Sequence, residues 1–96
     1  MALRLALMEI DFHLAACRSL KDKRRRMKKI GDRYAGSANI AVCESEFHDQ
    51  HDRARWSFVG VAASARVVEQ ILTEAERWVA QSVDATIVGV HNEHLR

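Results

Sequence analysis

The chain has no proline and only four glycines, so we expect neither long linkers nor disordered segments in its 96 residues. Its two cysteines, Cys17 and Cys43, form no C-x-x-C pair, which favours reduced thiols in a cytoplasmic protein. No apolar run approaches the length that crosses a bilayer, so no membrane contact is expected. The apolar start contains Arg4 and soon meets Glu9, which is not the pattern of a secretory signal peptide.

Motifs that carry catalysis are missing as well. There is no glycine-rich phosphate loop, and no serine, cysteine or threonine stands in a nucleophile elbow. A carboxylate pair at Glu9 and Asp11 would need a cleft that this size and composition do not suggest. Cys17 precedes a basic segment that could acidify its thiol, although a small packed cysteine is the commoner case. We therefore predict no catalytic residue, no cofactor and no small-molecule substrate, with a thiol-dependent enzyme as an alternative.

Two histidine pairs are the candidates for metal binding. His48 and His51 lie in an acidic turn, and His91 and His94 lie in the C-terminal tail. Imidazole and carboxylate groups are zinc ligands, but neither segment is expected to be helical, and the two pairs should lie at opposite ends of the sheet. We expect solvated histidines and no metal site, with a metal at His48 and His51 as the alternative.

Apolar periodicity predicts four strands and two helices. Alternation with period two indicates strands over 2–12, 39–47, 55–63 and 85–90, followed by a polar tail over 91–96. Helical spacing indicates one helix from Ser19 to about Gly36 and a second that begins at Ser64. The order βαββαβ with right-handed crossovers predicts one α+β domain over 1–96. We expect a ferredoxin-like sandwich, with a four-stranded antiparallel sheet ordered 4-1-3-2 and both helices on one face.

Three segments resemble a known family. They are Arg18–Arg24 (RSLKDKR), Asn39–Glu44 (NIAVCE) and Val68–Gln70 (VEQ). On these residues the chain resembles the YlxP-like family, a group of small bacterial proteins of unassigned function. The resemblance implies a ferredoxin-like fold and, because members are often encoded beside translation and ribosome-maturation factors, a role near RNA or the ribosome. His51 stands where many members have Trp, and Ser57 where many have Gly, so no role is carried over to those positions.

The charge of the chain is concentrated in one segment. Between Arg18 and Arg33 nine basic residues stand against two acids, so this segment carries +7 and the other eighty residues carry −5. Most of these cations lie opposite the apolar stripe of Leu20, Met27 and Tyr34, with few acids interleaved to pair with them. A concentrated positive surface attracts polyanions, so we predict contact with the phosphate backbone of RNA or of a ribosomal particle. The predicted contact residues are Arg18, Lys21, Arg24, Arg25, Lys28 and Lys29.

Other uses of this basic helix stay open. A solvated helix face that keeps the protein soluble is the commonest one. A homodimeric interaction module could instead dock an acidic protein partner on it. Lys23 falls inside the apolar stripe, where its stem could pack while its ammonium reaches water or pairs with Glu44.

Trp56 and Phe58 project to the same side of the third predicted strand. Some RNA-binding domains with this element order stack bases on aromatic residues of strands one and three, but strand one offers leucines here. We instead expect an apolar patch on the helix-free face of the sheet, buried in a homodimer. The predicted patch residues are Leu5, Leu7, Cys43, Trp56 and Phe58.

Overall fold

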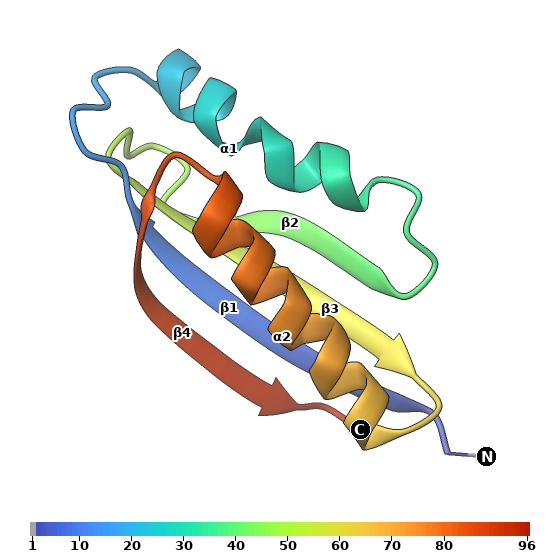
Figure 1. The fold of residues 1–96 in the computed structure, drawn as a ribbon. Helices are drawn as coiled ribbons and strands as arrows, with labels where there is room; N and C mark the ends of the chain where they lie inside the picture. Colours follow the sequence, from blue (N-terminus) through green and yellow to red (C-terminus); the bar gives the residue numbers. More distant parts are fainter. Residues whose placement is uncertain (1) are drawn as a thin grey trace.

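The fold places two helices on one face of a single antiparallel sheet (Figure 1). The computed structural model describes residues 2–96. The elements are β1 (Arg4–His13), α1 (Leu20–Tyr34), β2 (Ile40–Glu46), β3 (Arg53–Ala62), α2 (Ala65–Ser82) and β4 (Thr86–His94). The sheet order is β2-β3-β1-β4, with every pairing antiparallel. The predicted α+β ferredoxin-like sandwich is therefore confirmed.

The helices begin where their serines predicted. Ser19 Oγ accepts a hydrogen bond from the Asp22 amide at 3.0 Å, and Ser64 Oγ accepts one from the Val67 amide at 3.2 Å. Each bond satisfies an amide that the first helical turn cannot pair internally. After α1 the chain turns at Gly36, whose φ of 77° lies in the left-handed region that glycine tolerates best. None of the helices within residues 2–96 has the length and apolar character needed to cross a membrane.

Strand β4 runs further than its polar sequence indicated. The predicted strand ended at Val90, but pairing with β1 continues through Asn92, opposite Met8, to His94, opposite Ala6. The expectation that the segment from His91 onward is only a polar tail is therefore wrong. β4 is an edge strand whose residues after Val90 are exposed, so backbone pairing to the long β1 holds this part in the sheet without an apolar pattern.

The core lies between the sheet and the helices. Met8, Ile10 and Phe12 of β1 are at most 1% exposed and face α1 and α2. Helix α2 approaches β3 so closely that a Cβ on Gly60 would lie 3.0 Å from Val68 Cγ2. Helix α1 packs over β2 at one side of the sheet, and α2 lies along β1 and β3 (Figure 1). This arrangement leaves the outer surface of α1 open to solvent.

The predicted position of Trp56 and Phe58 is wrong. Residues directly opposite in an antiparallel pair share a face, and Phe58 lies opposite Met8 while Trp56 lies opposite Ile10. Both aromatic residues therefore face the helices, and Phe58 is 0% exposed with its ring edge-on to Tyr34. Neither can belong to a patch on the helix-free face or stack bases there. Both phases of β1 are apolar, so alternation alone did not reveal which phase faces inward.

The helix-free face has an apolar half and a charged half. Leu5 lies opposite Val61 and Leu7 opposite Val59, and all four side chains are half-buried. Cys43 also lies on this face, as predicted, and is exposed. The charged half follows along the same two strands and contains the ion pair of Asp11 in β1 and Arg55 in β3. Of the five predicted patch residues, Leu5, Leu7 and Cys43 therefore lie on the helix-free face.

Candidate nucleic-acid interface

Helix α1 is attached to the sheet by a narrow stripe of side chains. Its buried residues are Lys23, Met27 and Ile30. Lys23 is 3% exposed, and its Nζ donates to the backbone oxygens of Phe47 at 2.9 Å and Arg53 at 3.0 Å. The same atom lies 3.0 Å from Glu44 Oε2, which confirms the predicted pairing with Glu44. Most of the remaining residues of α1 are polar and exposed.

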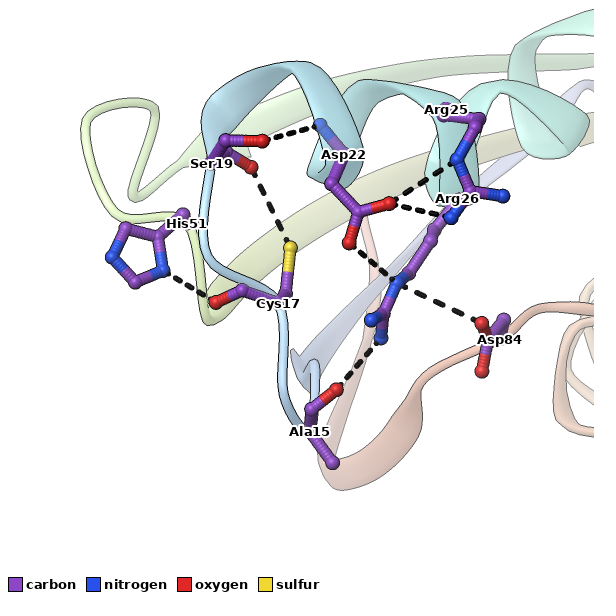
Figure 2. A network of polar contacts seen from close by, with 8 residues as sticks. All are labelled: Ala15, Cys17, Ser19, Asp22, Arg25, Arg26, His51 and Asp84. Atoms are coloured by element: carbon purple, nitrogen blue, oxygen red, sulfur yellow. Dashed lines mark hydrogen bonds and ion pairs between the residues drawn. The ribbon is translucent and has the colours of Figure 1, made fainter.

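The first acid of α1 is engaged by its own helix (Figure 2). The Asp22 carboxylate accepts hydrogen bonds from the guanidinium groups of Arg25 and Arg26. The hydrogen bond from Arg25 holds the pKa of the Asp22 carboxyl below its usual range. Arg26 also donates to the Ala15 oxygen at 2.9 Å and lies 3.7 Å from Asp84, and its side chain is only 11% exposed. Arg26 therefore connects α1 to neighbouring loops and is not part of the outward surface.

Two loops are held together next to the start of α1. Ring nitrogen Nδ1 of His51 lies 2.7 Å from the Cys17 oxygen, and Cys17 Sγ lies 3.5 Å from the Ser19 oxygen (Figure 2). The His48 ring nitrogen instead lies 3.1 Å from the Glu44 oxygen. The rings of His48 and His51, the alternative metal pair, therefore each contact a different backbone carbonyl. Within the described part of the chain, no three His, Cys, Asp or Glu residues are grouped to hold a metal ion.

All six residues predicted to contact RNA are exposed. Arg18 lies in the loop before α1, and the other five lie on the helix. Arg18, Lys21 and Arg24 form no ion pair with any residue in 2–96. These three cations surround the first turns of α1, where the helix dipole already disfavours positive charge.

The remaining three predicted residues are partly engaged. Arg25 pairs with Asp22, and Lys28 Nζ lies 3.4 Å from Asp32 Oδ2. The side chains of Arg25 and Lys28 are 72% and 74% exposed, so these pairs lie in water. Exposed pairs of this kind contribute roughly 0 to 1 kcal/mol, which a phosphate contact can replace. Lys29 Nζ donates to the Ser82 oxygen at 3.2 Å, next to the end of α2.

The sequence did not predict what the side chains of Trp56 and Arg33 contact. Trp56 lines a hollow beside Arg24 and Lys28, between α1 and the sheet. The Arg33 guanidinium lies 4.6 Å from the ring centroid of Trp78, so this cation packs against α2. The position of Trp56 beside the basic helix could have been predicted only if the side of β3 that faces the helices had been known.

Comparisons with known proteins identify the family and confirm the fold. A structural-genomics protein named YJCS has a TM-score of 0.62 and 6% identity over 96% of this chain and 99% of that chain. The de novo designed protein Foldit4 has a TM-score of 0.56 and 11% identity over 98% and 99% of the two chains. An amidase of the hydantoinase/carbamoylase family from Burkholderia multivorans has a TM-score of 0.58 and 11% identity, but the match covers 99% of this chain and 28% of the amidase.

These identities support a shared fold and no shared activity. No curated protein matches the chain. Residues 5–92 match the family described as "Protein of unknown function (DUF503)", which is most of the sequence. The chain is therefore a member of the DUF503 family.

Proposed function

We propose that this protein binds RNA in the cytoplasm without catalysing a reaction, using the outer surface of α1 to contact phosphates. The observation that carries the proposal is the position of Arg18, Lys21 and Arg24. They are exposed at the first turns of α1 and have no carboxylate partner within residues 2–96. Their like charges repel, and the helix dipole adds to that cost. A phosphate group beside them would relieve both costs.

The distribution of charge supports a polyanionic ligand. The segment from Arg18 to Arg33 carries +7 in a chain whose net charge is only +2. The nearest acid, Asp22, is turned toward Arg25 and Arg26 and so does not neutralise Lys21. The resemblance of residues 18–24 to YlxP-like proteins adds an association with translation factors and favours RNA of a ribosomal particle as the ligand. An acidic protein partner is the alternative ligand for the same surface.

A charge-reversal comparison tests the proposal. Lys21→Glu/Arg24→Glu/Lys28→Glu should weaken co-sedimentation with ribosomal particles, and binding to a ribosomal RNA fragment, by at least about tenfold at low salt. The matched control is Arg4→Glu/Arg66→Glu/Arg77→Glu, which changes the net charge equally at exposed positions away from α1.

The control separates surface contact from overall charge. If both variants lose RNA binding, only net charge matters. If neither variant loses RNA binding, the proposal is wrong. Binding of an acidic protein that the charge reversal abolishes, with no binding to RNA, would support the protein-docking alternative.

A further inference from the structure

A hollow of about 290 Å³ lies beside the proposed RNA surface, between α1 and the sheet. Its lining residues are Lys23, Arg24, Met27, Lys28, Glu44 and Trp56. Met27 and Trp56 contribute apolar side chains to this lining. Two of the six predicted RNA-binding residues, Arg24 and Lys28, lie at the same hollow. A flat apolar group and an anion could therefore bind next to each other here.

Glu44 supplies a fixed acceptor in the hollow. Its side chain is 24% exposed, and its Oε2 is held by the buried ammonium of Lys23. Lys23 is itself anchored by the backbone oxygens of Phe47 and Arg53. No residue in the described range 2–96 donates a hydrogen bond to Oε1 of Glu44. A carboxylate oriented in this way can accept N–H groups from a ligand.

The indole N–H of Trp56 lowers the stability of the fold. Its Nε1 is buried and has no hydrogen-bond partner in residues 2–96. An unpaired buried donor destabilises a fold, and an apolar residue opposite Ile10 would avoid that cost. An indole in the wall of a cationic hollow is suited to stacking against a base.

We propose that this hollow binds one unstacked nucleotide of single-stranded RNA, with its base against Trp56 and its phosphate on Arg24 and Lys28. The proposal rests on the proposed function and names the part of the RNA that it recognises. The base must carry N–H donors to satisfy Glu44. Because Oε2 of Glu44 is buried against Lys23, a base can reach only Oε1. Guanine presents two adjacent N–H groups to this oxygen, whereas the single N–H of uracil lies between two carbonyl oxygens that the carboxylate repels. The hollow therefore prefers guanine to uracil.

Fluorescence of Trp56 tests the proposal directly. The Trp78→Phe variant leaves Trp56 as the only tryptophan, because the chain has two. Single-stranded hexamers UUUGUU and UUUUUU are titrated at about 50 mM salt, while anisotropy of a label on the RNA measures total binding. The expected result is quenching of Trp56 and tighter binding of UUUGUU. Glu44→Gln should reduce that preference about tenfold, as expected for loss of a charge-assisted hydrogen bond to Oε1. The matched control is Glu46→Gln, at an exposed position of the same strand.

Each remaining outcome overturns the proposal in a distinguishable way. Binding of both hexamers with unchanged Trp56 fluorescence and no preference would remove the nucleotide site and leave the proposed function intact. If neither hexamer binds, both the nucleotide site and the proposed function are contradicted. Quenching by a poly-glutamate peptide in place of RNA would assign the hollow to an acidic protein partner. Trp56→Leu provides a second check if Trp78→Phe does not fold, since it should abolish the guanine preference in anisotropy while retaining phosphate contacts.

Discussion

The ammonium of Lys23 and the carboxylate of Glu44 lie 3.0 Å apart, and this contact joins α1 to β2. Lys23 also holds the turn between β2 and β3 through the oxygens of Phe47 and Arg53. One buried cation therefore fixes the orientation of the helix that presents the proposed RNA surface. A lysine within an apolar stripe is retained here because three oxygens replace its water.

Replacing this lysine should destabilise the fold. Lys23→Met keeps the stem but leaves the Glu44 carboxylate and two carbonyl oxygens without their partner. We expect a loss of about 3 kcal/mol in the free energy of unfolding, as found when one member of a buried ion pair is removed. Urea denaturation at neutral pH measures it. Glu44→Gln should cost less, because Lys23 keeps both carbonyls, and a loss below about 1 kcal/mol for Lys23→Met would contradict the anchoring role.

The ion pair of Asp11 and Arg55 on the helix-free face predicts a dependence of stability on pH. Arg55 Nε lies 2.6 Å from Asp11 Oδ1, and a second bond of 3.1 Å joins Arg55 Nη2 to Oδ2. The hydrogen bond from Arg55 lowers the pKa of the Asp11 carboxyl, against the opposing effect of burial. Because the folded pKa is below the unfolded value, the pair stabilises the fold above the unfolded pKa of about 3.9. That contribution is lost as the pH falls through the lowered folded pKa.

Asp11→Asn measures this contribution. The variant should be less stable than the native protein at pH 7 by roughly 0.5 to 1 kcal/mol, since both side chains are partly exposed. The difference should shrink in urea melts as the pH falls from 7 toward 2, because protonation of Asp11 removes the ion pair. The control is Asp49→Asn, an exposed residue of the β2–β3 turn that forms no ion pair in the described residues. An unchanged difference at pH 2 would rule out the ionic origin.

The apolar half of the helix-free face predicts self-association. We propose that the apolar half of this face contacts the same residues of a second copy, namely Leu5, Leu7, Val59 and Val61. A two-fold axis would place the apolar side chains of one copy against those of the other. Leu7→Glu should shift the protein to a monomer in sedimentation equilibrium, whereas Val67→Glu, at a side chain 44% exposed on α2, should not. Cys43 on the same face should lose reactivity toward a thiol reagent as protein concentration rises. A native protein that stays monomeric at micromolar concentration would contradict this expectation.

Much of the fold could be predicted from local patterns. Ser19 and Ser64 mark helix starts because a hydroxyl can cap the first turn, and the apolar periods separate helices from strands. The inward phase of β1 could not be predicted in this way, because Leu5 and Leu7 are as apolar as Met8 and Ile10. The end of β4 was missed for a related reason, since backbone pairing at an edge needs no apolar side chains.

The candidate site was only partly accessible to sequence reasoning. The exposed cations of α1 follow from their helical spacing, and Glu44 was correctly expected as the partner of Lys23. The hollow at Trp56 depends on the register of β3 against β1, which places the indole under α1. The use of Arg26 as an internal connector depends on Ala15 and Asp84, which come from distant loops. Contacts of this kind appear only once the chain is folded.

The salt dependence of RNA binding is the sharpest test of phosphate contact by α1. Affinity for a labelled single-stranded ribosomal RNA fragment is measured by anisotropy at several salt concentrations, for the native protein and the Lys21→Glu/Arg24→Glu/Lys28→Glu variant. We predict that log K against log salt falls with a slope of about −2 to −4, because each of roughly three to six phosphate contacts releases about 0.7 of a counterion. The slope of the variant should be much closer to zero. Undetectable binding by the native protein at low salt, or a slope that charge reversal leaves unchanged, would contradict phosphate contact by α1.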